Sequence, residues 1–423
     1  MFWFCFSRIV MHRRVVVTGM GAVTPVGNTV SEFWNSLVSG KSGVSLTQAF
    51  DTTGYDCKIS AEVKNFDATS SFKNPKDCRR ADRCIQLAIA AAKQSYDHAS
   101  LATASVSPER IGVIVGSGIG GLKILEDQHS ILMTKGPSRV SPFMIPMMIS
   151  NITAGMIAME FGFQGINFSV TSACATSNHA IGEAWKTIRF DEADIMVCGG
   201  TEAAVTPLGL SGFAAMKALS TRNNAPEKAS RPFDVGRDGF VLGEGAGILV
   251  LEEYEHARKR GVPIYGEILG YGATADAYHL TSPAPHGAGA ARAMKLALSH
   301  AKISADEVDY INAHGTSTPQ GDIAETEAIK SVLSNHASKV MVSSTKSMIG
   351  HLLGAAGAVE MVACLQTLNT GVVHPTINLE QPDIECTLDY VPNTARQASI
   401  RTAMSNSFGF GGHNACVIAR KLA

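Results

Sequence analysis

The chain has almost no excess of charge of either sign. Its 36 lysines and arginines balance 37 aspartates and glutamates, and the formal net charge is -1. Proteins that bind nucleic acid without sequence preference need a broad positive field, because their affinity comes from neutralised phosphates. The composition therefore predicts no nucleic-acid partner, and an acidic protein partner would have to meet a local basic patch.

Long hydrophobic runs are missing as well. The apolar segment 1–10 lacks the basic start and the length of a signal peptide or a membrane span, and no later stretch is long enough to cross a bilayer. We expect no membrane insertion. We interpret segment 1–10 as a short extension, with translation starting at Met1 or at Met11, and expect the fold to begin near residue 12.

Cysteine pairs at metal-binding or redox spacing are also absent. The nine cysteines are odd in number, and no two of them form a C-x-x-C pair. We therefore expect reduced thiols, with no zinc site and no redox dithiol.

The chain does contain much apolar sequence, divided by short turns. Hydrophobic residues make up 45% and charged residues 17%, which is typical of a soluble globular enzyme with a large core. The alternation of β-branched runs with helical patterns favours an α/β protein with largely buried, mixed sheets. The predicted strands lie near residues 13–21, 111–115, 167–170, 195–198, 247–251, 267–271, 310–312, 340–343 and 415–419.

Two parts of the chain repeat one pattern. A strand at 167–170, a turn and a helix near Cys174 are matched by a strand at 340–343, a turn and a helix near His351. Either the chain contains two related halves, or these are ordinary strand-turn-helix units of an α/β protein. The pattern alone leaves both interpretations open.

Cys174 stands at the first of these strand-helix junctions. Free N–H groups and the helix dipole at such a junction stabilise a thiolate, so we expect a nucleophile near neutral pH. The small neighbours Ala173 and Ala175 would let a thioester approach closely. The alternative is a buried cysteine that serves only as a small hydrophobic side chain.

Two histidines and a lysine offer partners for this thiol. His314 ends a predicted strand at a turn rich in Gly and Thr, and Lys346 and His351 lie on the segment that enters a glycine-rich helix. One cysteine and two histidines suit acyl transfer through a thioester, with imidazoles stabilising negative charge on a carbonyl. The competing use, a metal site, is disfavoured because the three residues lack zinc-type spacing.

Residues 403–414 contain several glycines around Phe410, and we expect a loop before the final strand. In such a loop the backbone could donate an N–H to a ligand while the ring moves. The alternative is a packed turn in which Phe410 is an ordinary anchor.

In their order along the chain, these motifs resemble those of the β-ketoacyl-acyl-carrier-protein synthases of the thiolase superfamily, most closely the type II enzymes. The resemblance runs from about Arg13 to the C-terminus, and one departure is His413, where threonine is common in the family. It rests on segments 15–21 (VVVTGMG), 116–121 (GSGIGG), 171–176 (TSACAT), 231–234 (RPFD), 239–247 (GFVLGEGAG), 312–316 (NAHGT), 346–351 (KSMIGH) and 409–412 (GFGG).

The resemblance implies a thiolase-like α/β fold of two similar halves, residues 12–262 and 263–423, in a layered α-β-α-β-α arrangement with mixed five-stranded sheets. It implies that Cys174 accepts an acyl group from acyl carrier protein, and that the N–H groups of Cys174 and Phe410 form the oxyanion hole. His314 and His351 would assist decarboxylation of malonyl-acyl carrier protein and stabilise the enolate. The product would be a 3-oxoacyl chain two carbons longer, made without cofactor or metal.

Further positions match family roles. Lys346 and Glu360 would support the histidines. The substrate-binding positions are Thr316, Thr318, Thr281, Ile119 and Phe213, of which the last two would bound the acyl tail. The basic residues expected to dock the carrier protein are Lys76, Arg79, Arg80, Arg139, Lys217 and Arg222.

The family also implies a homodimer that pairs through strand 167–170, and a cytoplasmic enzyme of the bacterial type, with an organellar location as the alternative. Thiolases and Cys-His-Asn condensing enzymes of the synthase III or chalcone type are the nearest alternative enzymes, and segment 346–351 disfavours both. A catalytically silent chain-length partner on the same fold is disfavoured by the joint presence of Cys174, His314 and His351.

Overall fold

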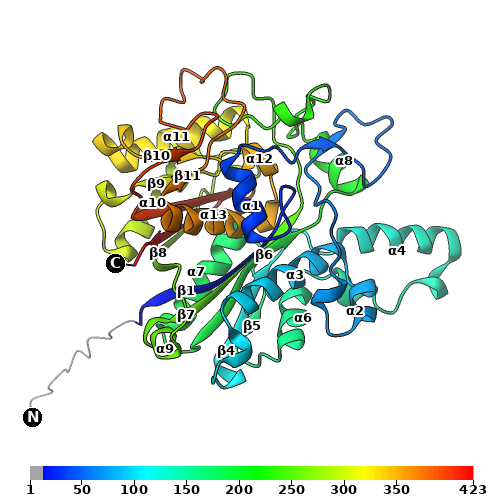
Figure 1. Cartoon of the computed structure of the whole chain (residues 1–423). Helices are drawn as coiled ribbons and strands as arrows, with labels where there is room; N and C mark the ends of the chain where they lie inside the picture. The colour runs from blue at the N-terminus through cyan, green and yellow to red at the C-terminus, as the bar shows by residue number, and fades with distance from the viewer. Residues whose placement is uncertain (1–12, 423) are drawn as a thin grey trace, which may run out of the picture.

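The structure, a computed structural model, describes residues 13–422. Segment 1–10 and the alternative start at Met11 lie outside the described residues. Hydrogen bonds join ten strands into one sheet, in the order β10-β9-β13-β14-β8-β1-β7-β6-β4-β5 (Figure 1). These strands are β1 (Val15–Val23), β4 (Ile111–Gly116), β5 (Asn167–Phe168), β6 (Ile195–Glu202), β7 (Gly245–Glu253), β8 (Gly266–Ala275), β9 (Tyr310–Asn312), β10 (Met341–Ser343), β13 (Thr402–Gly409) and β14 (His413–Arg420).

The sheet consists of two groups of five strands with the same topology. The order β1-β7-β6-β4-β5 corresponds to β8-β14-β13-β9-β10, and in both groups the first two contacts are antiparallel and the last two parallel. Only the residue pairs Val16 with Glu267 and Val17 with Gly266 join the groups. The expected mixed five-stranded sheets are present, and the interpretation of two related halves is favoured. The boundary at residues 262 and 263 stays a prediction.

Helices lie on both faces of each group. Helix α3 packs on β1 and β7, α7 and α13 lie between the two groups of strands, and α10 packs on β8 and β14. Figure 1 shows α4 projecting from one side of the molecule. The helices are α1 (Val30–Val38), α2 (Pro75–Arg80), α3 (Arg83–His98), α4 (Leu122–Lys135), α5 (Met144–Met148), α6 (Ile152–Phe161), α7 (Thr176–Arg189), α8 (Pro207–Ala215), α9 (Tyr254–Arg260), α10 (Ala288–Ala301), α11 (Pro319–Leu333), α12 (Lys346–Ile349) and α13 (Ala356–Thr370).

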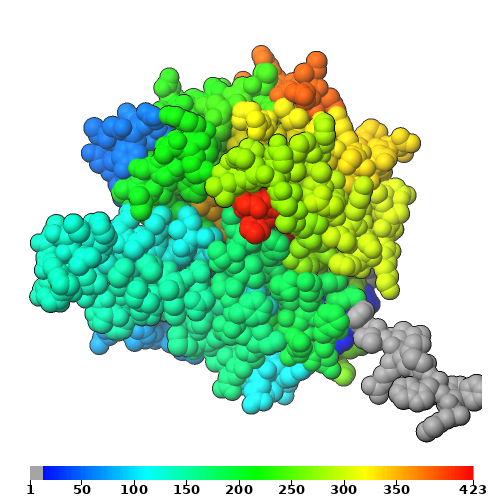
Figure 2. Space-filling view, turned by 180° about the vertical axis from the view of Figure 1, so that it is seen from behind, coloured from blue at the N-terminus to red at the C-terminus, as the bar shows by residue number. Residues whose placement is uncertain are grey.

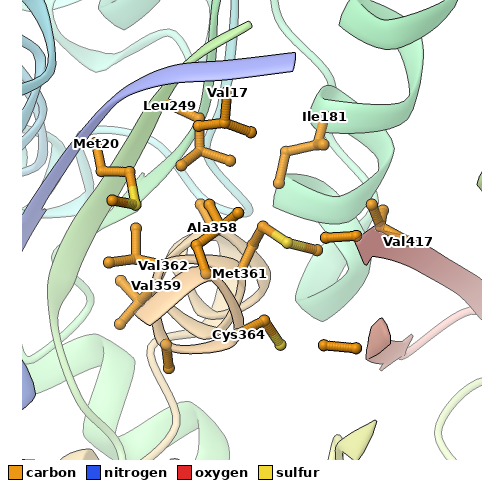
Figure 3. Close-up of a cluster of buried hydrophobic side chains, with 14 of the residues drawn as sticks. Val17, Met20, Ile181, Leu249, Ala358, Val359, Met361, Val362, Cys364 and Val417 are labelled. Carbon is orange, nitrogen blue, oxygen red and sulfur yellow. The ribbon is translucent and has the colours of Figure 1, made fainter. Parts of the chain in front are cut away.

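The central helix α13 is buried around most of its surface, as a helix in the middle layer must be, and Glu360 is its one charged residue. In Figure 3, Val359 and Val362 face Met20 of β1, while Met361 lies toward Ile181 of α7 and Val417 of β14. Glycines permit close packing where the chain enters this helix. A Cβ at Gly354, just before α13, would lie 2.5 Å from the nitrogen of Gly118.

The expectation of a loop over residues 403–414 is wrong. Residues Thr402–Gly409 form strand β13, which pairs with both β9 and β14, and only residues 410–412 make the turn. Ser405, Asn406 and Ser407 are typical turn residues in a sequence, but here they are fully buried in the middle of the sheet. Tertiary contacts have overridden their local preference.

Within residues 13–422, no helix combines the length and the apolar character that a membrane crossing requires. The eight cysteines of the same part of the chain are all free thiols and all buried.

Candidate active site

Cys174 lies in the 3-10 turn η5 (Ala173–Ala175), directly before the central helix α7. Ala173 adopts the left-handed backbone conformation, with φ 51°, and so turns the chain into the helix. The end of β13 lies against this turn, because a Cβ at Gly409 would come within 3.0 Å of the Cys174 nitrogen. This close approach places Phe410, the next residue, beside the thiol.

Burial changes the expected chemistry of the thiol. Desolvation raises the pKa of Cys174 to about 12, although Lys346 and the backbone N–H groups of Phe410 and Cys174 lower it. The expectation of a thiolate near neutral pH from the helix junction alone is therefore wrong, since burial outweighs the donors around the sulfur. The donors remain important, because they converge where negative charge would develop during acyl transfer.

His351 is held in one orientation. Its backbone N–H donates to the carbonyl of Val241 at 2.7 Å, and its Nδ1 accepts the N–H of Leu353 at 3.2 Å. Burial and the charge of Lys346 hold the pKa of His351 well below its usual value. A neutral imidazole that accepts at Nδ1 carries its proton on Nε2, and Nε2 lies 2.9 Å from Sγ of Cys174. His351 therefore presents an N–H donor to the thiol.

His314 presents a donor by a different contact. Nζ of Lys346 lies 3.5 Å from its Nδ1, and an ammonium group can only donate, so the imidazole proton is on Nε2. Burial, Lys346 and His351 together hold the pKa of His314 well below its usual value. The His314 and His351 rings meet edge to face, with centroids 5.4 Å apart.

Lys346 and Glu360 form a buried ion pair behind the histidines, with side chains 1% and 0% exposed. Burial raises the pKa of Glu360, and the neighbouring Lys346 lowers it. Lys346 reaches Nδ1 of His314, and Glu360 pairs with the same ammonium group.

The structure brings Cys174, His314 and His351 together more closely than sequence spacing indicated. Each offers one ligand atom, and these atoms lie within 4.8 Å of one another, so spacing alone was no argument against a metal. The separation of 2.9 Å between Sγ and Nε2 is that of a hydrogen bond. Two ligands of one tetrahedral zinc ion, at about 2.0 and 2.3 Å from the metal, would be roughly 3.5 Å apart.

Sequence reasoning missed three buried carboxylates around this centre. Glu325 accepts the backbone N–H groups of His314 and Gly315 at 2.9 and 2.8 Å, and so fixes the loop that carries the histidine. Asp322 accepts the N–H of Phe233. Their spacing of three residues, at the start of the helix after His314, was a usable signal for two carboxylates on one face. Glu202, at the end of an apolar strand, gave no such signal.

A cavity of about 750 Å³ opens onto the thiol. In Figure 2 a small red patch, the colour of the last residues of the chain, reaches the surface among green and yellow-green segments. Ile119, expected to bound the acyl tail, is not among the residues that line the cavity and is 40% exposed. The predicted residues that do line it are Cys174, His314, His351, Phe213, Thr281, Thr316, Thr318, Phe410 and Lys217.

The basic residues proposed for docking lie on several segments of this chain. Lys217 borders the cavity and is exposed, whereas Lys76, Arg79 and Arg80 lie on α2, where the Arg80 guanidinium stacks over the Phe143 ring at 4.7 Å. Arg139 is exposed in the 3-10 turn η4 (Pro137–Arg139) after α4, and Arg222 is half-buried and donates to the carbonyl of Gly236.

The sequence matches two family models in succession. Residues 12–257 match the beta-ketoacyl synthase N-terminal domain, and residues 265–380 match the C-terminal domain. The protein named 3-oxoacyl-[acyl-carrier-protein] synthase 2 in Synechocystis sp. is 52% identical over 97% of this chain and 98% of its own length. The protein of the same name in Vibrio harveyi is 50% identical over 97% of this chain and 99% of its own.

Solved structures of the same kind superpose closely. A beta-ketoacyl synthase from Burkholderia phymatum has a TM-score of 0.91 at 35% identity, covering 97% of this chain and all 100% of that one. A type II PKS ketosynthase, solved in complex with its acyl-carrier protein and bound to a hexaketide, has a TM-score of 0.90 at 37% identity over 97% of this chain and 100% of its own.

Proposed function

Because the chain belongs to the β-ketoacyl synthase family, we propose that its cavity carries out the decarboxylative condensation by which fatty acids are elongated. An acyl group on Cys174 joins with malonyl-acyl carrier protein to give 3-oxoacyl-acyl carrier protein and CO2. The observation that carries this proposal is the convergence of one thiol and two neutral histidines, both with Nε2–H donors, at the end of one cavity.

The first step loads the enzyme. Sγ of Cys174 forms a bond to the acyl carbon, the bond from that carbon to the pantetheine sulfur breaks, and the thiol proton leaves with the released pantetheine thiol. The N–H groups of Cys174 and Phe410 approach the sulfur and are placed to stabilise the tetrahedral oxyanion. Since burial keeps the thiol protonated, the proton moves during this exchange and not before it.

The second step uses the histidines. The bond between malonyl carbon and carboxylate breaks, CO2 leaves, and the electron pair becomes an enolate whose oxygen accepts from Nε2–H of His314 and His351. The enolate carbon then attacks the acyl carbonyl, the bond to Sγ breaks, and a proton from water restores the thiol. A neutral imidazole suits this role, because it donates a hydrogen bond from its N–H group while it remains uncharged.

Substrate positions follow from the lining of the cavity. Thr316 and Thr318, whose hydroxyl groups lie 3.0 Å apart, and Thr281 offer hydrogen bonds to a pantetheine arm, while Phe213 offers an apolar wall to the acyl tail. The partner is the carrier protein that presents both thioesters.

Mass spectrometry tests this function directly. Incubation with acyl- and malonyl-acyl carrier protein should produce an acyl adduct on Cys174, 3-oxoacyl product and CO2. Cys174→Ala should lower condensation at least about 1000-fold with unchanged circular dichroism, because Cys174 is the one cysteine among the residues that line the cavity. A parent protein that never acylates would instead be a silent chain-length partner.

We also propose a homodimer and a cytoplasmic location. Strand β5 is a sheet edge with both residues exposed, and Met159 on α6, which packs on β5, is a further exposed apolar side chain. Such an edge favours pairing with a second copy. Eight free thiols in residues 13–422 and relatives from bacteria support the cytoplasm.

A further inference from the structure

The end of β6 carries a buried carboxylate that neither reaction step uses. Glu202 is 0% exposed, and four donors converge on it. Oε1 accepts the hydroxyl of Ser117 at 2.8 Å and the N–H of Ile119 at 3.2 Å, while Oε2 accepts the N–H groups of Gly118 at 2.8 Å and Gly354 at 3.1 Å. None of the ion pairs within residues 13–422 involves Glu202.

Gly354 holds the place in the second half of the fold that Cys174 holds in the first. Each is the middle residue of a 3-10 turn, η5 or η10 (Leu353–Ala355), that leads into a central helix. The first residue of each turn has a left-handed backbone, with φ 51° at Ala173 and 47° at Leu353. Turn η5 packs on β13 and η10 on β6, and β13 and β6 occupy the same position in their groups of strands.

This correspondence gives Glu202 a distinctive position. The N–H of Cys174 is placed to receive the oxyanion of the reacting thioester, and the corresponding N–H of Gly354 is already occupied by the Glu202 carboxylate. The second half therefore contains a turn of the same kind, whose N–H group is directed at an internal carboxyl group.

The same turn controls His351. The N–H of Leu353 donates to Nδ1 of His351, and the next N–H along the chain, that of Gly354, donates to Glu202. A leucine in the left-handed region is strained, so contacts must hold it there. The carbonyl of Gly354 accepts the Ser177 hydroxyl, which holds the turn from its other side.

We propose that Glu202 is a positioning residue: by anchoring the Leu353–Gly354 peptide it keeps the proton of His351 on Nε2, where the enolate needs a donor. This role rests on the proposed condensation. An amide in place of the carboxylate would turn an NH2 group toward N–H donors, and the Leu353 turn would relax away from Nδ1. His351 would then hold its proton on either nitrogen, while acyl loading, which uses the N–H groups of Cys174 and Phe410, would be spared.

The variant Glu202→Gln tests this in the full-length enzyme, with Glu252→Gln as the matched control. Glu252 is equally buried, on the adjacent strand β7, and binds Thr18 and Arg260, so its loss reports the general cost of removing a buried carboxylate. Two rates are measured, that of acyl transfer to Cys174 and that of condensation. The imidazole ¹⁵N chemical shifts of His351 are measured as well, and the His351 signals are identified by their loss in His351→Gln.

For Glu202→Gln we expect condensation to fall about tenfold or more while acyl loading changes less than about threefold, with His351 becoming a mixture of tautomers. Glu252→Gln should leave the ratio of the two rates and the ¹⁵N pattern as in the parent. An unchanged ratio and pattern in Glu202→Gln, or equal loss of both rates, would overturn the inference.

The parent enzyme provides a second measurement if Glu202→Gln does not fold. Its His351 must show the Nε2–H pattern, and a proton on Nδ1 would overturn the inference without any variant. A parent that shows this pattern but never condenses would refute the proposed function and leave the positioning of His351 standing.

Discussion

Nζ of Lys346 lies 3.5 Å from Nδ1 of His314, so a buried cation and a neutral histidine share one hydrogen bond. The contact fixes the imidazole proton on Nε2 and opposes protonation of the ring. The same ammonium group is paired with Glu360. Lys346 thus governs the proton of His314, while the backbone of Leu353 governs that of His351.

The histidines should separate the two half-reactions. We expect His314→Ala and His351→Ala to lower condensation about 100-fold or more and to change acyl loading less than about threefold, because loading depends on the N–H groups around Cys174. Lys346→Ala should resemble them. Rapid-quench mass spectrometry of the acyl adduct, alongside product formation, measures both; a histidine variant that condenses at the parent rate would contradict the assignment.

Phe213 should control which acyl chains enter. It lines the cavity and packs edge to face on Phe240, which in turn contacts the His351 ring. We expect Phe213→Ala to shift kcat/KM toward longer chains by about tenfold, since a larger apolar pocket favours each added methylene by about 1 kcal/mol or more. A uniform loss across all chain lengths would argue against this wall.

Lys217 should contribute to docking of the acidic carrier protein. It is the one residue of the proposed docking set that borders the cavity, and its exposed pair with Asp56 at 3.5 Å is weak. Lys217→Glu should raise KM for carrier-protein substrates and flatten its salt dependence, because such steering is screened over about 8 to 10 Å. Turnover of small pantetheine thioesters should stay near the parent value.

The substitutions Arg79→Glu and Arg80→Glu are to be compared with Lys217→Glu, since both arginines lie on α2, which does not line the cavity of this chain. Equal losses with carrier-protein and small thioesters would mean that the mutated residue supports the fold and not the partner.

The exposed edge at β5 should hold a dimer together. Phe168 is 43% exposed there, and we expect Phe168→Glu to produce monomers, because a charge would be buried on pairing. Leu296 on the outer helix α10 is 40% exposed, so Leu296→Glu is a matched control that should remain dimeric. Light scattering at micromolar concentration distinguishes the two. A parent protein that is already monomeric would refute the dimer.

His374 should make the fold sensitive to acid. Burial lowers the pKa of His374 from 6.5 to about 4, although the Pro375 carbonyl raises it. The unfolded chain therefore takes up a proton that the native state refuses, so stability is fully present above about pH 6.5 and declines as pH falls toward 4. The loss amounts to at most about 3 kcal/mol. In urea unfolding, the free energy of unfolding should fall less between pH 7 and pH 4.5 for His374→Gln than for the parent protein. An equal fall in both proteins would contradict this origin.

Much of the fold could be predicted from local patterns in the sequence. The predicted strands at 310–312 and 111–115 became β9 and most of β4, and Ile181, Trp185 and Ile188, which are spaced as one face of a helix, are buried. These signals are local, because the period of side chains along a strand or helix records which face is buried. The ordered motifs around Cys174, His314 and His351 likewise indicated the family before any contact was known.

Other properties of the site and the fold depend on contacts between distant parts of the chain, which local patterns do not record. Cys174 and His351 are 177 residues apart, yet Sγ of one lies 2.9 Å from Nε2 of the other, and burial among these distant segments raises the pKa of the thiol. The polar residues of β13 are stable in a strand because neighbouring strands surround them, which no local preference records. Glu202 is bound by N–H groups of both halves, that of Gly118 from the first and that of Gly354 from the second. Sequence patterns do not reveal such a site, because desolvation and hydrogen bonding depend on distances in space and not on separation along the chain.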